Sequence, residues 1–476
     1  MDVLVAIAPI LLLIYLMAKK KSMPSGRALP LSALVLYVLQ LTYFATDPNL
    51  LNAAVLQGLL TAFTPILIVW GAILLFRAME YSGAMDVVRR WLNGITDNKV
   101  AQLMIVGWSF SFLIEGASGF GTPAALAAPL LVGLGFSPLP VAILCLVMNT
   151  VPVSFGAVGM PTWFGFAPLG LSEMELRELG FKTAIVHSVA ALFIPIVALR
   201  FVVTFREIWA NLVFILLAIL ASVLPYLWFA SWNYEFPALA GGFVGLIGAV
   251  LLARFDVGLQ KNLQGEHSST EKIRFGTLLR AFFPLWGTLL LLLITRIPQL
   301  GLRGWLSSAE PARATQLGTL GEFRISPSLV MQLNNLLGTD LDWSHAILYV
   351  PSFLPFLLIA WLSFHVMRRS PGSAVPLETR SNDCMQAVQD AVRQVRKPLA
   401  AFLGALVFVK ILTAGGENSS ANLIGSAFAS IMGNTWQYAA PLLGALGSFF
   451  SGSNTVSNLT FGGIQDSIAQ NLTLNR

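Results

Sequence analysis

The chain has 476 residues, of which 56% are hydrophobic and 11% charged, with a net charge of +6 at pH 7. Soluble domains carry roughly 25% charged residues, so this composition excludes an ordinary soluble protein and indicates a polytopic helical membrane protein. The basic residues gather in short segments between apolar runs, which is typical of membrane orientation signals and not of nucleic-acid binding.

The first apolar run, 3–17, is followed by Lys19, Lys20 and Lys21. A cleaved signal peptide carries its positive charge before the apolar run, so this segment is predicted to be an anchor. Apolar runs of spanning length continue along the chain. We expect spanning helices at about 2–18, 29–45, 51–77, 138–158, 182–203, 208–230, 236–254, 280–298, 346–366 and 398–414.

A polar, glycine-rich stretch, Glu115-Gly-Ala-Ser-Gly-Phe-Gly-Thr-Pro123, interrupts the apolar run 101–134. A charge at the bilayer centre costs about 2.5–3.5 kcal/mol on insertion scales, so Glu115 is expected to line a cavity enclosed by protein. Thr122 and Pro123 are typical of a helix start. The stretch predicts the tip of a re-entrant hairpin, whose returning helix presents free N–H groups to an anion.

A second hairpin is predicted at 437–470, to pair with the first at 101–135. If each enters and leaves on one side, most of the 29 basic residues fall on the cytoplasmic side and the N-terminus lies outside. Three longer loops remain, at 255–279, 299–345 and 367–397. The last contains an expected short amphipathic helix at 384–396, and the polar 299–345 loop has no assigned role.

Two parts of the chain share a pattern. Ala72-Ile-Leu-Leu-Phe-Arg77 precedes the first hairpin as Ala405-Leu-Val-Phe-Val-Lys410 precedes the second, and Gly116 aligns with Gly452. Inverted repeats with broken helices that meet near the midplane are typical of secondary transporters. Small polar residues at a hairpin tip can also serve only close helix packing, and this alternative stays open.

The first hairpin is followed by a predicted crossing helix, 138–158, whose polar middle is rich in Pro and Gly. Its counterpart after the second hairpin is missing, so the second repeat is expected to be incomplete. The fold class predicted is an all-α polytopic membrane protein with inverted repeats, two re-entrant hairpins and a broken crossing helix. Four divisions are expected: an N-terminal helix with its basic loop (1–28), the first repeat (29–203), a linking part (204–279) and the second repeat (280–476).

Three motifs resemble the bacterial L-lactate permease family of lactate and glycolate proton symporters. They are the 115–123 stretch, the polar helix middle at 149–161, and Gly452-Ser-Asn-Thr-Val-Ser-Asn458. The resemblance runs over nearly the whole chain. It implies a scaffold domain, a mobile transport domain with an elevator-type movement, and further helices beyond the second hairpin, so that this chain is expected to be C-terminally truncated.

The resemblance also implies a substrate site at the two tips and the helix break. Hydroxyls, amides and backbone N–H groups suit a small carboxylate that must also be released, and the same residue types also cap broken helix ends. The candidate substrate-binding residues are Ser118, Gly119, Thr122, Asn149, Thr150, Ser453, Asn454, Thr455 and Asn458.

Glu115 is the preferred proton-coupling residue, against the alternatives of a structural acid and of direct substrate contact. His187 is a second candidate, although a lone membrane histidine more often serves packing. Arg77 and Lys410 are interpreted as snorkelling anchors near opposite faces, with anion gating as the alternative. The remaining histidines form no metal cluster, and neither a cofactor nor a disulfide between Cys145 and Cys384 is expected.

The function predicted is uptake of small 2-hydroxy monocarboxylates (L-lactate, D-lactate, glycolate) with protons across the bacterial inner membrane, with the N-terminus in the periplasm. A channel-like anion permease and an inactive truncated transporter stay as alternatives. An intramembrane enzyme is not favoured, because paired acids, an HExxH motif and a Ser/His arrangement are all missing from the sequence. The expected partners are a small carboxylate, a proton and membrane lipid, with a homodimer as one candidate assembly.

Overall fold

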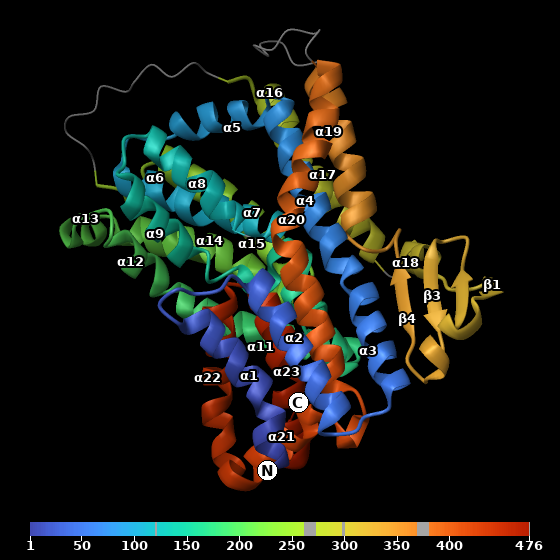
Figure 1. Ribbon diagram of the computed structural model, residues 1–476. Helices are drawn as coiled ribbons and strands as arrows, with labels where there is room; N and C mark the ends of the chain where they lie inside the picture. The colour runs from blue at the N-terminus through green and yellow to red at the C-terminus, as the bar shows by residue number, and fades with distance from the viewer. Residues whose placement is uncertain (120, 261–272, 298–299, 369–379, 476) are drawn as a thin grey trace.

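Helices make up most of the molecule in the computed structural model, which describes the chain except residues 120, 261–272, 298–299, 369–379 and 476 (Figure 1). The α-helices are α1 (Asp2–Ala18), α2 (Ser25–Thr42), α3 (Pro48–Thr61), α4 (Phe63–Tyr81), α5 (Ala84–Asn93), α6 (Lys99–Gln102), α7 (Ser111–Ser118), α8 (Thr122–Gly133), α9 (Pro138–Met148), α10 (Gly156–Trp163), α11 (Glu173–Ala191), α12 (Ile194–Leu199), α13 (Phe205–Ala210), α14 (Leu212–Ala230), α15 (Pro237–Arg254), α16 (Phe275–Ala281), α17 (Phe283–Arg296), α18 (Leu302–Ser307), α19 (Ile359–Arg368), α20 (Arg380–Thr413), α21 (Ser420–Met432), α22 (Trp436–Ser451) and α23 (Asn454–Asn471).

Several of these helices have the length and composition of membrane spans. Within the described residues, four are long and apolar enough: Pro48–Tyr81, Lys99–Ser118, Leu212–Ala230 and Pro237–Arg254. Two bent helix pairs raise the number to six if each pair is one span, and shorter apolar helices occupy other predicted spans. The prediction of a multi-pass membrane protein is confirmed.

Two long helical segments run through the middle of the molecule (Figure 1). Helices α3 and α4 follow one another with little interruption, and α20 packs along both of them and along α2 (Figure 1). Glycines allow this close approach. A Cβ on Gly58 would lie 2.8 Å from the Val407 backbone, and one on Gly404 would lie 2.5 Å from the Pro30 ring.

Each of these long helices leads to a short helix and then to a helical hairpin. Helix α5 lies at the top of Figure 1, and α21 lies at the bottom. The first hairpin runs through α6, the π-helix η1 (Leu103–Phe110) and α7, then turns at Gly119 and Gly121, both with positive φ, into α8. The second hairpin is α22 and α23, joined at Gly452 with φ +63°. Glycine takes such positive φ angles without steric cost.

The first hairpin packs on α15 through a glycine crossing. A Cβ on Gly116 of α7 would lie 2.2 Å from the Leu239 backbone nitrogen, and a Cβ on Gly242 of α15 would lie 2.2 Å from that of Leu113. Each glycine therefore lets the backbone of the opposite helix come into direct contact. Helix α14 covers the other face of α15.

The predicted crossing helix is broken. Helix α9 ends at Met148, and a bend of 66° separates it from the segment that contains η2 (Val153–Phe155) and α10. Inside α10, Ala157 and Val158 have left-handed φ angles of +46° and +58°. The indole Nε1 of Trp163 donates to the Val158 carbonyl at 3.0 Å, which helps to hold this turn.

A four-stranded antiparallel sheet corrects the all-α prediction. Its order follows the chain: β1 (Arg313–Gln316), β2 (Glu322–Ile325), β3 (Val330–Asn334) and β4 (Trp343–Ala346). The sheet occupies the 299–345 loop and packs on α3 through a small apolar cluster that includes Ala53, Leu336 and Trp343. The strands are only four or five residues long, at the short end of the range in which alternation marks a strand, and β1 is exposed at all four positions.

Helix α20 corrects a second expectation. The sequence predicts a surface helix at 384–396 separate from a span at 398–414, but one helix of 34 residues covers both despite Pro398. Proline removes one hydrogen bond and bends a helix, and here packing on α2, α3 and α4 keeps the helix continuous. Most of the other buried hydrophobic residues form one large core that runs through both hairpins and the long helices.

Candidate functional site

A cavity of about 790 Å³ lies where the two hairpin tips meet the helix break. One wall comes from the first tip and the α9–α10 break, and a second from the residues around Gly452. Faces of α4 and α20 close the cavity on the side of the long helices. Segments far apart in the chain therefore line one space of a size typical of small-molecule sites.

Glu115 is buried in the wall of this cavity, at 2% exposure. The amide nitrogen Nδ2 of Asn149 donates to Glu115 Oε2 at 3.0 Å. The other oxygen, Oε1, faces Gly156, where an added Cβ would lie only 2.1 Å away. The carboxyl group thus touches the helix break on one side, and Gly156 is the residue that leaves room for it.

Asn149 stands at the end of α9, where the crossing helix breaks. Its Oδ1 is buried and has no hydrogen-bond partner among the residues the structure describes. A buried acceptor without a partner is unfavourable unless a ligand or water satisfies it. Asn149 thus lines the cavity with its amide nitrogen bound to Glu115 and its amide oxygen left without a partner in the described residues.

The second tip is tied to the broken helix by side-chain amides. Asn454 Nδ2 donates to Ser154 Oγ at 2.9 Å, and Asn458 Nδ2 donates to the Pro161 carbonyl at 2.9 Å. Ser453 caps α23, since its Oγ accepts from the Val456 backbone N–H at 3.3 Å. The start of α23 is in this way fixed against the α9–α10 break.

His187 lies on α11, behind this contact. Its Nε2 and Ser154 Oγ are hydrogen-bonded at 2.9 Å, so a chain of polar groups runs from His187 through Ser154 to Asn454. His187 does not line the cavity itself. Sequence reasoning missed Ser154, which is buried and joins the histidine to the second tip.

The predicted site residues divide into two groups. Seven line the cavity: Glu115, Gly119, Thr122, Asn149, Ser453, Asn454 and Thr455. The others lie outside its wall. The hydroxyl of Ser118 donates to the Ile114 carbonyl within α7, and that of Thr150, just past α9, donates to the Val147 carbonyl. Asn458 holds α10, and His187 contacts Ser154.

Five polar residues of the cavity were not assigned to the site from sequence: Ser25, Arg77, Glu80, Gln394 and Ser451. Arg77 Nη1 donates to Glu80 Oε2 at 2.5 Å, and both side chains are about one-third exposed, at 30% and 31%. The sequence did offer one sign of this pairing, because residues three apart on a helix are neighbours and Arg77 precedes Glu80 by three. Lys410, its counterpart in the repeat pattern, does not line the cavity.

The cavity wall can bind a small anion. Helices α8 and α23 both begin at it, so their free N–H groups and the positive ends of their dipoles are near. The hydroxyls of Thr122, Ser453 and Thr455 add donors. In the described part of the chain, no group of three His, Cys, Asp or Glu side chains could hold a metal ion.

A multi-pass membrane protein with a cavity between hairpin tips and a helix break, lined by both polar and apolar side chains, belongs to the class of membrane transporters. Comparison with known proteins defines the class further. The chain matches the L-lactate permease family over residues 2–476. It belongs to that family.

Relatives agree with this assignment. The chain is 45% identical over 98% of its length to a Haemophilus influenzae protein whose name assigns it as an L-lactate permease, covering 86% of that protein. It is 26% identical to the L-lactate permease of Bacillus subtilis, over 98% of this chain and 83% of the other. It is 35% identical to the glycolate permease of Escherichia coli K12 over 39% of this chain and 34% of that one. No solved structure matches the chain.

Proposed function

We propose that this protein takes up small 2-hydroxy monocarboxylates, such as L-lactate, D-lactate and glycolate, together with protons. The names of its relatives, L-lactate permeases and a glycolate permease, support the substrate class. The observation that carries the proposal is the burial of Glu115 in the wall of the same cavity that holds two helix starts and several hydroxyl donors.

The substrate carboxylate binds at the two tips. The N–H groups at the starts of α8 and α23, with Thr122, Ser453 and Thr455, supply donors without a fixed cation. Asn149 Oδ1, which lacks a partner in the described structure, accepts a hydrogen bond from the 2-hydroxyl. Ser118, Thr150 and Asn458 support the tips and the break from outside the wall.

Glu115 carries the proton. An ionised Glu115 repels the substrate carboxylate at short range, and protonation removes this repulsion. Arg77 and Glu80 neutralise each other, so they add no net charge to the cavity. The empty cavity then has a net charge of −1 from ionised Glu115. The loaded cavity also has a net charge of −1, from the substrate carboxylate, because Glu115 is then protonated. Equal charge in the two states suits a carrier that moves both empty and loaded. His187 is a second candidate, acting through Ser154.

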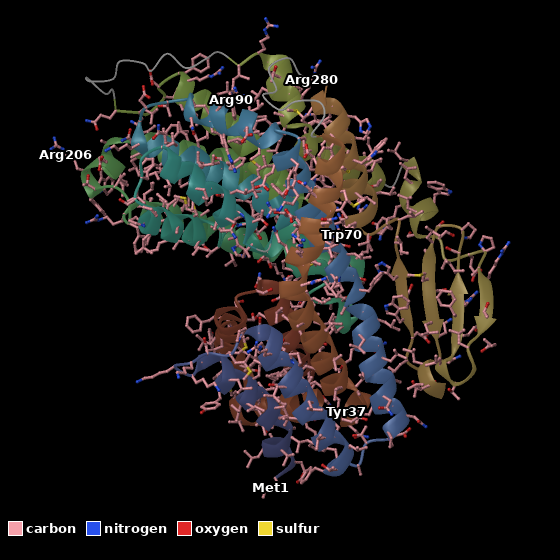
Figure 2. The ribbon with its side chains drawn as sticks, turned by 45° about the horizontal axis from the view of Figure 1, so that its top comes forward. Met1, Tyr37, Trp70, Arg90, Arg206 and Arg280 are labelled. Carbon is pink, nitrogen blue, oxygen red and sulfur yellow. The ribbon has the colours of Figure 1, made fainter. Side chains whose placement is uncertain are left out.

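We further propose that the chain contains inverted repeats with two re-entrant hairpins, a scaffold and an elevator-type transport domain. The opposite ends at which α5 and α21 lie support this (Figure 1). Figure 2 shows Arg90 and Arg280 at the end of the molecule opposite Met1. Under the positive-inside rule, that arrangement favours an N-terminus in the periplasm and a bacterial inner-membrane location.

The test is uptake of labelled L-lactate into proteoliposomes that contain the 476-residue chain, with an inward proton gradient. Accumulation above the outside concentration is expected for the wild type. Glu115→Gln is expected to lose accumulation but keep exchange of internal for external lactate, because exchange needs no net proton movement. Full accumulation by Glu115→Gln would refute the carrier role.

Two other outcomes identify the alternatives. Rapid equilibration without accumulation would indicate a channel-like anion permease. Absence of both accumulation and exchange in protein that elutes as a single species from size-exclusion chromatography would indicate an inactive transporter.

A further inference from the structure

The cavity extends away from the hairpin tips along α4. Its lining on that helix is one stripe: Val69, Ile73, Phe76, Arg77 and Glu80. At a rise of 1.5 Å per residue, the stripe is about 16 Å long. On α20, the lining from Gln394 to Phe402 forms a matching stripe. Both stripes place their polar residues at the same end, since α4 and α20 pack together.

At that end Arg77 is held by two partners. Its guanidinium forms the ion pair with Glu80. The second partner is Gln394, whose amide is oriented so that its oxygen faces the guanidinium. This oxygen accepts a hydrogen bond from Arg77 Nε at 3.0 Å. Arg77 is the only basic side chain among the described residues that line the cavity. Its side chain is 30% exposed and lies in the cavity wall, which supports the anion-gating alternative to a snorkelling anchor.

We propose that the Arg77–Glu80 pair is an ion-exchange gate, in which the substrate carboxylate replaces Glu80 on the Arg77 guanidinium as it passes this end of the cavity. The proposal rests on the proposed function, since it needs a monocarboxylate substrate. Arg77 donates one hydrogen bond to Glu80, through Nη1, and a guanidinium can donate to a substrate carboxylate with two parallel hydrogen bonds. Arg77 keeps a carboxylate partner throughout the exchange, and the displaced Glu80 carboxylate, which is already 31% exposed, is hydrated instead.

The geometry gives each residue a separate effect. Arg77 attracts the anion, and Glu80 competes with it, so that the anion does not stay bound. Gln394 holds the guanidinium from α20 while its carboxylate partner changes. If the pair served only to stabilise α4, removal of either residue would act in the same direction.

The experiment measures initial rates of L-lactate uptake in proteoliposomes, as KM and maximal rate, for Arg77→Gln, Arg77→Lys and Glu80→Gln. The matched control is Arg89→Gln, because Arg89 and Asp86 form a pair with the same spacing on α5, outside the cavity. Arg77→Gln is expected to raise KM about tenfold or more, the size of a lost charge-assisted hydrogen bond. Arg77→Lys is expected to recover part of this loss.

Glu80→Gln is expected to act in the opposite direction. It lowers KM about threefold or more and lowers the maximal rate, because the anion then leaves Arg77 more slowly. In the double variant, KM follows Arg77→Gln. A KM of Arg77→Gln within twofold of that of the control would overturn the gate. The gate would also be overturned if Arg77→Gln and Glu80→Gln lost maximal rate equally and kept the wild-type KM. Wild-type protein that transports neither lactate nor glycolate would instead overturn the proposed function, and the gate with it.

Discussion

Asn149 shows how one side chain can connect a proton site to substrate recognition. Its Nδ2 is held by Glu115, while its Oδ1 is buried without a partner in the described residues. If that oxygen accepts the 2-hydroxyl of the substrate, a substrate without the hydroxyl leaves a buried acceptor unsatisfied. Sites that bind a hydroxyl in this way reject analogues that lack it.

Asn149→Ala is therefore expected to reduce the preference for lactate over propionate about tenfold. The change removes the acceptor for the hydroxyl and leaves the carboxylate donors in place. The measurement is inhibition of labelled lactate uptake by unlabelled lactate and by propionate. Asn93→Ala, on an exposed position at the end of α5, is the control. An unchanged preference in Asn149→Ala would contradict the assignment of the hydroxyl.

Gly156 is the second residue whose role follows from distance. A Cβ at this position would overlap Glu115 Oε1, at 2.1 Å. Gly156→Ala is expected to lower the initial rate of lactate uptake at least about tenfold, because the carboxyl group must move away from Asn149. Gly133→Ala is the control, because a Cβ there meets nothing within 4 Å. Equal rates in both variants would show that Glu115 tolerates displacement.

At the scale of elements, the crossing of α7 and α15 fixes where the first hairpin lies. Gly116 and Gly242 each contact the backbone of the other helix. Gly242→Ala is expected to destabilise the protein by about 1–3 kcal/mol, because the helices must separate to admit the methyl group. Thermal unfolding followed by tryptophan fluorescence measures this, against Gly276→Ala in open space. A midpoint equal to that of the control would mean that the crossing is loosely packed.

A buried ion pair joins the α14–α15 connection to α17. Arg296 Nε donates to Glu235 Oε2 at 2.7 Å, with side-chain exposures of 5% and 9%, and Arg296 Nη2 donates to the Tyr349 carbonyl at 2.9 Å. Removing one partner leaves a buried charge. Glu235→Gln is expected to cost about 3–5 kcal/mol of stability.

The control for this pair is Glu178→Gln. Glu178 pairs with Lys182 at 2.7 Å, but both side chains are more than half exposed. Loss of an exposed pair is expected to cost less than about 1 kcal/mol. Chemical or thermal unfolding of the two variants separates the two cases, and similar costs would show that water reaches Arg296.

At the scale of the whole molecule, an exposed pair connects α11 with α18, next to the sheet. Arg303 donates to both carboxylate oxygens of Glu173. These hydrogen bonds hold the pKa of Glu173 below its ordinary value of 4.5. Because the pKa is depressed in the folded state, the pair stabilises the protein above pH 4.5 and loses its effect as the pH falls through the folded-state pKa.

The difference in unfolding midpoint between the wild type and Glu173→Gln is therefore expected to be larger at pH 6 than at pH 3. Its size stays small, below about 1 kcal/mol, since Glu173 is 53% exposed and screened by solvent. Thermal unfolding at both pH values measures it. A difference that grows toward pH 3 would contradict the sign of the pKa shift.

Much of this arrangement was predictable from the sequence, because its signals are local. The polar break around Glu115 and the glycines of both tips mark the hairpins, and the Pro- and Gly-rich middle of the crossing helix marks its break. The roles given to the tip residues stay predictions. Arg77 was interpreted as an anchor, since no local pattern tells whether a basic residue near a helix end faces lipid or a cavity.

Other features depend on contacts between distant segments. The unpartnered oxygen of Asn149 depends on how α7 meets the α9–α10 break, and the link from His187 to Asn454 depends on Ser154. The continuity of α20 through Pro398 depends on its packing neighbours. Local propensity is overridden in such places by tertiary structure.

The sheet on α3 has a practical consequence. A strand edge with unpaired backbone groups does not lie in hydrocarbon, so the β1 edge projects into water. The sheet is attached by its own apolar cluster to α3, which continues into the cavity-lining helix α4. A rigid antibody fragment raised against β1–β4 would therefore serve as an alignment marker for electron cryomicroscopy of a 51.5 kDa membrane protein. It would report the position of α4 while the hairpin tips and their cavity stay free to bind substrate.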